Sequence, residues 1–344
     1  MTTPKHLNSL SEFLLQAQTQ YLIFDLGRGL KKIDNQVFFE WENQQAPCAY
    51  PRQDHAWFCI SFWNQQLSQD RYIWFVKLPV DENGLMIQAS RNQFLEIIVT
   101  ALGASLEHTS NSDAQLPENP YVFQPSQQQL ADCNAHIRKH INDVSRDNQQ
   151  AERYLQAPSV APWQSLSVQN MADYVCQIEN SETCAKQAVL AQNLMQYPVP
   201  VLNCIFASLE STYVNQVLAN AIMAFHKQTS EHTMQALSLR AISHHRSSDD
   251  KVVQYVAGLI NSQGINSVEV AVVIAGRYWE VLTDNDLQLS YMHQVCELDG
   301  SFELFKAIYA DLVKIPSCRD NTLGLLRNPH RSELVAKGIG SLFA

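Results

Sequence analysis

The chain has 344 residues, of which 46% are hydrophobic and 17% charged, and its formal net charge is −10. That length exceeds what one ordinary hydrophobic core supports, so two domains are expected. The negative charge argues against sequence-independent binding to nucleic acid, and no polybasic block indicates an anionic membrane partner. The first residues lack the pattern of a secretory signal, and no apolar run approaches the roughly 20 residues of a membrane span. We therefore expect a soluble, cytoplasmic protein.

Cysteine usage agrees with that location. The chain contains 8 cysteines, and none of them forms a C-x-x-C pair. Several lie within apolar helical patterns, where a free thiol behaves as a small hydrophobic side chain. In a chain of this size the pattern predicts reduced thiols rather than a disulfide framework.

The first third of the chain predicts a small α+β domain over residues 1–103, with an antiparallel sheet and flanking helices. Ser9 and Glu12 form a capping-box pattern that starts a helix. Aromatic and β-branched segments then predict strands: "YLIFDLGRGLKKI", "QVFFEWE", "AWFCISFW" and "RYIWFVKLPV". Both alternating faces of "AWFCISFW" are largely apolar, which predicts a central strand covered on both sides. "RNQFLEIIVTALG" predicts a helix that ends at Gly103.

Two features of this part have a structural and a functional interpretation. Four of the six tryptophans fall between Trp41 and Trp74, and such a cluster can fill a sheet core or form a recognition surface or ligand pocket. "DLGRG", from Asp25 to Gly29, has glycines of the kind found in phosphate loops. It lacks the third glycine of a dinucleotide fingerprint, so a kink or bulge in a strand is favoured.

Residues 104–125 are polar and interrupted by prolines, which predicts a linker. From residue 126 to residue 344, helical patterns start about every 17 residues, so a helix pair spans about 34, within the range of stacked helical repeats. "ALSLRAISHH" is similar to the second helix of a HEAT-like or armadillo-like repeat. The sequence therefore predicts an all-α domain over 126–344, either a solenoid of such repeats or an irregular helical bundle.

The segment "CNAHIRKH" has the spacing of a candidate zinc site. Cys133, His136 and His140 lie at i, i+3 and i+7, so a helix can place them on one face. The same segment also follows the pattern of an ordinary helix with an apolar stripe, and Arg138 and Lys139 do not favour binding of a dication. We interpret it as the polar face of a helix, and we predict no metal site and no cofactor.

Arginines within apolar helical stretches are the candidate binding residues. A charge in such a place needs a partner. In a structural interpretation the arginines pair with aspartates of adjoining helices, such as Asp311, and fix the stacking of the repeats. In a functional interpretation some of them line a groove and bind an acidic partner. The residues concerned are Arg240, Arg277, Arg319 and Arg327, with Trp279 beside Arg277.

The chain also resembles a family of bacterial proteins of unknown function and nearly this length. The resemblance rests on "IWFVKLPVDENGL", "WQSLSVQNMADYV", "GRYWEVL" and "ADLVKIPSCRD". That family is associated with a short Leu-Asp-Glu motif, and here Val80 stands before Asp81 and Glu82 in place of the leucine. The resemblance implies no catalytic residues. Asp81 and Glu82 are predicted to form a turn after a strand, with a contact site as the alternative.

The stronger catalytic and metal motifs, H-E-x-x-H, G-x-S-x-G and the EF-hand loop, are not present in the sequence. The sequence therefore favours a non-catalytic protein-binding or adaptor protein that uses a helical-repeat surface. One alternative is an enzyme or small-molecule sensor with a pocket in the aromatic-rich N-terminal domain or at the domain junction. Another is a self-associating structural subunit.

Overall fold

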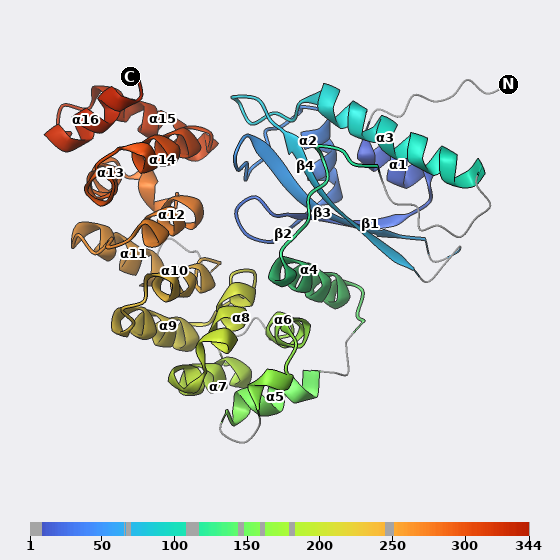
Figure 1. Ribbon diagram of the computed structural model, residues 1–344, viewed down its shortest axis with the longest axis horizontal. Helices are drawn as coiled ribbons and strands as arrows, with labels where there is room; N and C mark the ends of the chain where they lie inside the picture. The colour runs from blue at the N-terminus through green and yellow to red at the C-terminus, as the bar shows by residue number, and fades with distance from the viewer. Residues whose placement is uncertain are drawn as a thin grey trace. The chain divides into compact units, whose positions relative to one another are not determined.

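The computed structural model describes residues 9–64, 66, 70–107, 117–143, 148–158, 162–178, 183–244 and 251–343. The chain divides into two compact units, unit 1 (residues 1–125) and unit 2 (residues 126–344). Unit 1 contains a sheet with helices, and unit 2 is built of helices (Figure 1).

Unit 1 is formed around a four-stranded antiparallel sheet with the order β2-β1-β3-β4. Its strands are β1 (Gln20–Asp25), β2 (Lys31–Ile33), β3 (His55–Trp63) and β4 (Arg71–Pro79). Its helices are α1 (Leu10–Gln16), α2 (Asn35–Glu42) and α3 (Gln88–Glu107). The three helices lie on one face of the sheet (Figure 1). The central position predicted for "AWFCISFW" is that of β3, which pairs with β1 and β4.

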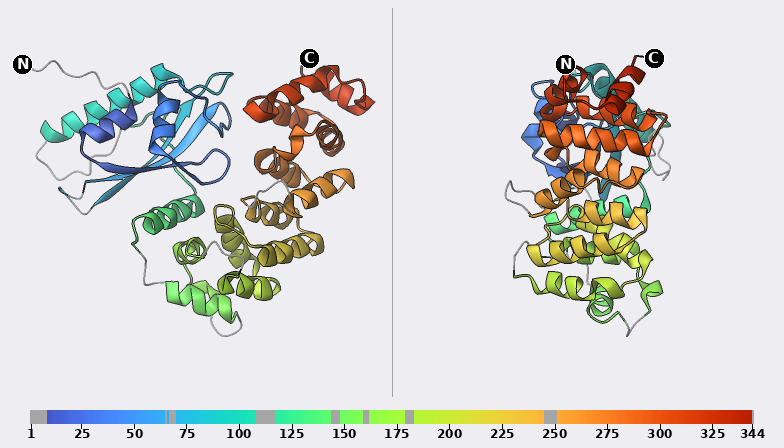
Figure 2. Two further views of the ribbon diagram at one scale, coloured as in Figure 1. Left: turned by 180° about the vertical axis from the view of Figure 1, so that it is seen from behind. Right: turned by 90° about the vertical axis from the view of Figure 1, so that its left-hand side faces the viewer.

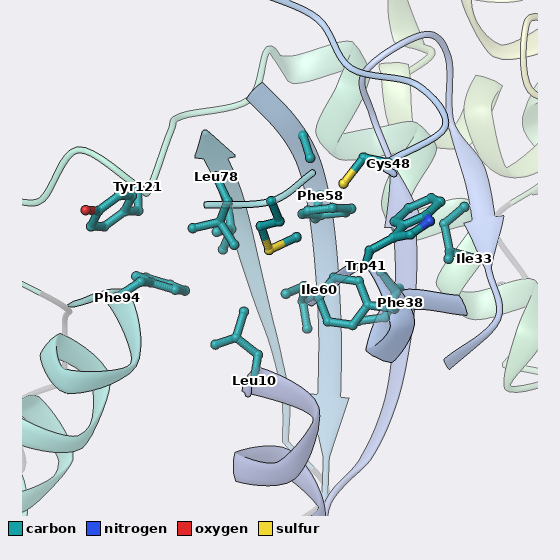
Figure 3. Close-up of a cluster of buried hydrophobic side chains, with 14 of the residues drawn as sticks. Leu10, Ile33, Phe38, Trp41, Cys48, Phe58, Ile60, Leu78, Phe94 and Tyr121 are labelled. Carbon is teal, nitrogen blue, oxygen red and sulfur yellow. The ribbon is translucent and has the colours of Figure 1, made fainter. Parts of the chain in front are cut away.

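The core of unit 1 lies between the sheet and these helices (Figure 3). Phe58 and Ile60 from β3 are fully buried and pack with Leu10 of α1, Phe38 of α2 and Phe94 of α3. Because side chains alternate along a strand, Phe58 and Ile60 lie on the same face of β3. This is the face that packs against the helices. Aromatic rings add specific contacts, such as the edge-to-face pair of Phe38 and Phe58 at 5.1 Å between centroids.

Two predicted elements of unit 1 differ from the structure. "QVFFEWE" is not a strand but helix α2, because the Asp34 side chain caps it by accepting from the Gln36 N–H at 2.8 Å. Phe38 and Trp41, three residues apart, then share the buried face of the helix. Helix α3 does not end at Gly103 but continues to Glu107.

The segment expected to be a linker, 104–125, belongs in its described parts to unit 1. Its first residues complete α3. Further on, the Lys77 N–H donates to the Tyr121 carbonyl at 2.8 Å, and the Phe123 N–H donates to the Phe75 carbonyl at 3.1 Å. These bonds pair residues 121–123 with part of β4, so this stretch continues the sheet rather than leading away from it.

Unit 2 consists of helices joined by short connections. Its α-helices are α4 (Gln127–His140), α5 (Asn148–Gln156), α6 (Val168–Cys176), α7 (Ala185–Asn193), α8 (Val199–Leu209), α9 (Gln216–Gln228), α10 (His232–Ala241), α11 (Lys251–Asn261), α12 (Val268–Arg277), α13 (Asn285–Leu298), α14 (Glu303–Val313), α15 (Pro316–Gly324) and α16 (Glu333–Ser341). Short 3-10 helices are η1 (Trp163–Ser165), η2 (Leu194–Gln196), η3 (Val281–Thr283) and η4 (Leu325–Arg327).

These helices pack in two rows. In the first row, which we name the inner row, each helix contacts the next; its helices are α4, α6, α8, α10, α12 and α14. In the second row, which we name the outer row, each helix also contacts the next; its helices are α5, α7, α9, α11 and α13. Contacts such as α9 with α10 and α12 with α13 join the rows. The helices follow one another in a curved stack with the inner row on its concave side (Figures 1 and 2).

Local signals in the sequence start several of these helices. The Ser126, Asn215 and Ser267 side chains accept hydrogen bonds from the N–H groups three residues later. Within the described residues, no helix has the length and apolar character needed to cross a membrane.

Candidate functional site

Two of the arginines singled out in the sequence meet at one carboxylate. Arg240, near the end of α10, donates from Nε to Glu210 Oε2 at 3.0 Å, and its Nη2 binds the same oxygen. Arg277, the last residue of α12, donates from Nε to Glu210 Oε1. Glu210 is the C-cap residue of α8. One acidic side chain therefore joins three consecutive helices of the inner row.

The packing of these helices explains the convergence. α10 contacts both α8 and α12, so residues near the C-terminal ends of all three can meet. A positive charge is also favourable in the last turn of a helix, where Arg240 and Arg277 stand. Planar guanidinium groups suit a shared carboxylate because they donate along fixed directions.

The electrostatic balance at Glu210 favours its charged form. Burial opposes ionisation of this carboxyl group, but the charges and hydrogen bonds of Arg277 and Arg240 outweigh that effect and hold its pKa below the usual range. The Glu210 side chain is 7% exposed, whereas that of Arg240 is 36% exposed. The solvent-exposed part of this ion pair is therefore the Arg240 side chain.

A second carboxylate lies next to this group, on α4. Asp132 Oδ1 accepts from the Ser208 hydroxyl at 2.6 Å, and Gln128 Nε2 lies 3.1 Å from each carboxylate oxygen. Burial raises the pKa of Asp132 to about 6; the hydrogen bonds from Ser208 and Gln128 act against burial, and the charge of Glu210 adds to it. Asp132 therefore exchanges a proton at mildly acidic pH, unlike an ordinary aspartate.

The histidine of "CNAHIRKH" joins the same cluster. His136 Nε2 lies 3.0 Å from the Ser211 hydroxyl oxygen. Burial lowers the pKa of His136 to about 3, with the charges of Lys139, His140 and His244 acting in the same direction, so its ring is neutral. Among the residues that the structure describes, no group of three or more His, Cys, Asp or Glu side chains is placed to hold a metal ion.

A serine next to a histidine can act as a nucleophile and base. Here the Ser211 hydroxyl also donates to the Ser208 carbonyl, at 3.1 Å. When its single proton points to that carbonyl, the imidazole becomes the donor to Ser211 and cannot accept the serine proton. These hydrogen bonds connect α4 with the end of α8.

We name these side chains the Glu210 cluster. They come from α4, from the end of α8, and from α10 and α12. Opposite charges and hydrogen bonds connect them, which is the arrangement that holds packed helices in one register. The cluster consists of Gln128, Asp132, His136, Ser208, Glu210, Ser211, Arg240 and Arg277.

The other predicted site residues lie outside the cluster. Trp279 is buried, and its carbonyl accepts from the Cys318 thiol at 3.2 Å. Arg319 is half-buried on α15, and Arg327 is exposed at the end of η4.

Asp81 and Glu82 lie in unit 1, in the turn that follows β4. Asp81 Oδ1 accepts from the N–H groups of Asn83 at 2.9 Å and Leu85 at 2.8 Å. Gly84 adopts a φ of 79° in this turn, which a side chain would disfavour. The hydrogen bonds of Asp81 are thus those of a turn, whereas Glu82 is exposed.

The inner row also exposes apolar side chains. Val268 and Val272, one turn apart on α12, are 44% and 50% exposed. Gly276 continues the same line, and no atom lies within 4 Å of where its Cβ would stand. Because α10 and α14 flank α12 and α13 packs against it, these residues occupy the face of α12 left open to the concave side. This valine stripe (Val268, Val272) was not singled out in the sequence.

Glu210 was missed as well. It is separated from Arg240 by 30 residues and from Arg277 by 67. The available signal was an acidic residue at the end of the apolar helix "VPVLNCIFASLE".

Comparison with known proteins gives a family but no activity. One family, described as "Protein of unknown function (DUF3549)", matches residues 5–343. No curated protein matches the chain. No solved structure matches it either.

Proposed function

The chain belongs to the DUF3549 family of proteins of unknown function, and we propose that it is a non-catalytic protein-binding or adaptor protein whose contact surface is the inner row of unit 2. The bacterial origin and cytoplasmic location expected from the sequence are part of this proposal. The observation that carries it is the packing of helices in two rows, with an inner face that exposes valines.

The two rows support a solenoid of HEAT-like or armadillo-like repeats. In a solenoid each helix pair contacts its neighbours along one direction, and an extended surface remains on the concave side. The contacts along unit 2 have this order, since α8, α10 and α12 follow one another on one side and α9, α11 and α13 on the other. In an irregular bundle, helices distant along the chain would share one core.

The valine stripe supports a polypeptide as the partner. Exposed apolar side chains on consecutive turns lose contact with water when a partner packs on them, which favours binding. The Glu210 cluster supports the same role, since it joins α8, α10 and α12 by ion pairs. A preformed surface loses less conformational entropy on binding than a flexible one.

Affinity capture from native lysate tests the proposal. The full chain and residues 126–344 serve as separate baits, and mass spectrometry is the readout. The proposal predicts one stoichiometric protein retained by both baits. If neither bait retains a protein through washing, the adaptor function is wrong, and the enzyme or sensor alternative in unit 1 becomes the better hypothesis. Retention of the chain itself favours the self-associating subunit.

A further inference from the structure

Asp25, at the end of β1, is a fully buried carboxyl group with one oxygen unsatisfied. Its Oδ1 accepts from the Gly27 N–H at 2.8 Å. Its Oδ2 finds no hydrogen-bond donor within the described part of the chain. The side chain has no exposed surface. A buried carboxylate oxygen without a donor is costly, whereas a protonated carboxyl group needs less solvation.

Two backbone segments are packed against each other around this carboxyl group. One is the turn between β1 and β2, and the other is the segment 50–52. A Cβ at Gly27 would lie 1.9 Å from the Tyr50 carbonyl oxygen, so only glycine permits this approach. Arg28, which is 3% exposed, donates from Nε to the Pro51 carbonyl at 3.1 Å. A small movement of either segment therefore changes the other.

Several charged and titratable groups face Asp25. Lys31 of β2, Arg28 of the turn and Arg52 of the second segment favour its ionised form. The Cys48 thiol is also coupled to it, since the charge of Asp25 adds to the effect of burial in raising the pKa of Cys48. Asp54 and His55 lie two and three residues after Arg52 in the sequence.

Two of these cations lie over aromatic rings. Lys31 Nζ lies 3.8 Å from the centre of the Tyr50 ring, and the Arg52 guanidinium lies 4.4 Å from that of Trp57. Trp57 in turn donates from Nε1 to the Arg52 carbonyl at 2.9 Å. The indole N–H of Trp57 is therefore a direct reporter of the position of the 50–52 segment.

Burial raises the pKa of Asp25 to about 7; the Gly27 N–H and the three cations act against burial. Ionisation would place a negative charge on the unsatisfied Oδ2. Two of the cations that favour the ionised form, Arg28 and Arg52, contact the Pro51 carbonyl and the Trp57 ring, so a shift of either toward Oδ2 alters those contacts.

We propose that Asp25 is a proton-controlled latch, which holds the β1–β2 turn against the 50–52 segment when its carboxyl group is neutral and releases Arg52 from the Trp57 ring when it is ionised. The latch lies in unit 1, whereas the surface proposed above lies in unit 2. It provides a way for the environment to alter the basic and aromatic surface formed by Lys31, Tyr50, Arg52 and Trp57.

Nuclear magnetic resonance of the full chain tests the latch. The Trp57 Nε1–H resonance is followed from pH 5 to pH 9 in the wild type and in Asp25→Asn. The substitution keeps an oxygen acceptor for the Gly27 N–H but cannot ionise. The expected result is a single transition of the resonance with a midpoint about pH 7 in the wild type, and no transition in Asp25→Asn.

Two further variants separate Asp25 from other groups. Asp34→Asn changes the exposed N-cap of α2 and is expected to keep the transition. His55→Gln removes the imidazole whose centroid lies 6.3 Å from that of Trp57, and is also expected to keep it. The latch is wrong if the wild-type resonance does not move between pH 5 and 9, if the transition persists in Asp25→Asn, or if it disappears in His55→Gln.

Discussion

Arg277 of α12 binds the same carboxylate, that of Glu210, as Arg240 of α10. The pair of arginines thereby connects the ends of three helices that follow one another in the inner row. The structural interpretation made from the sequence predicted that these arginines pair with an acidic residue of an adjoining helix. Arg240 and Arg277 make this kind of contact. The partner is a glutamate rather than an aspartate.

Glu210→Gln is expected to destabilise the folded chain. The substitution leaves two arginines without their charged partner, and loss of one partner from a buried ion pair costs about 3 kcal/mol. Urea unfolding followed by circular dichroism gives this free energy. Glu269→Gln, on the exposed first turn of α12, is the matched control and should change it by less than about 0.5 kcal/mol. Equal effects of the two substitutions would show that the Glu210 cluster does not hold the helices.

The stability of the chain is expected to depend on the protonation of Asp132. Its pKa is about 6 in the folded chain and 3.8 ordinarily, so the folded state binds a proton that the unfolded state has lost. The contribution is complete below pH 4, declines as the pH rises to about 6 and is constant above that value. Asp132→Asn removes this decline, which amounts to about 3 kcal/mol.

Urea unfolding of Asp132→Asn and the wild type at several pH values measures that difference. Comparing the two proteins at each pH cancels the contribution of His136, whose lowered pKa gives a slope of the opposite sign. Asp286→Asn, in the exposed first turn of α13, is the control. A difference between Asp132→Asn and the wild type that stays constant from pH 4 to 6 would contradict the assignment.

Two glycines are expected to respond oppositely to substitution by alanine. Gly27→Ala places a Cβ 1.9 Å from the Tyr50 carbonyl oxygen, so the turn has to move, and we expect a loss of about 3 kcal/mol. Gly258, inside α11, has no atom within 4 Å of its Cβ position, so Gly258→Ala should stabilise by roughly 0.5–1 kcal/mol. Thermal unfolding of both variants measures these changes. A tolerated Gly27→Ala would contradict the close approach.

The parts of the fold that could be predicted from the sequence are those determined by residues close together along the chain. Ser9 caps α1 as its spacing to Glu12 indicates, accepting from the Glu12 N–H at 3.0 Å. The central position of β3 was predictable because both faces of "AWFCISFW" are largely apolar, which can be read within one segment. Helix α2 was missed because Phe38, Phe39 and Trp41 have high strand propensity. The cap at Asp34 and the packing of Phe38 against Phe58 determine the helix instead.

The candidate site was predictable only in part, since its contacts join distant segments. Arg240 and Arg277 stood out because a charge within an apolar helix needs a partner. That both reach Glu210 follows from the packing of α8, α10 and α12, which no local pattern contains. The glycines of "DLGRG" drew attention to this turn, but the burial of Asp25 had no local signal, since it depends on how the turn and the 50–52 segment pack.

The valine stripe gives the most direct test of the proposed function. Val272 of the inner row and Val217 of the outer row are 50% and 51% exposed, so a glutamate at either position has similar access to water. Quantitative affinity capture then compares wild type, Val272→Glu and Val217→Glu as full-chain baits in the same lysate. The account predicts that Val272→Glu weakens binding of the captured protein about 30-fold, as expected for about 2 kcal/mol lost at an interface centre. It also predicts that Val217→Glu binds as the wild type does. Unchanged binding by Val272→Glu, or equal loss in both variants, would contradict it.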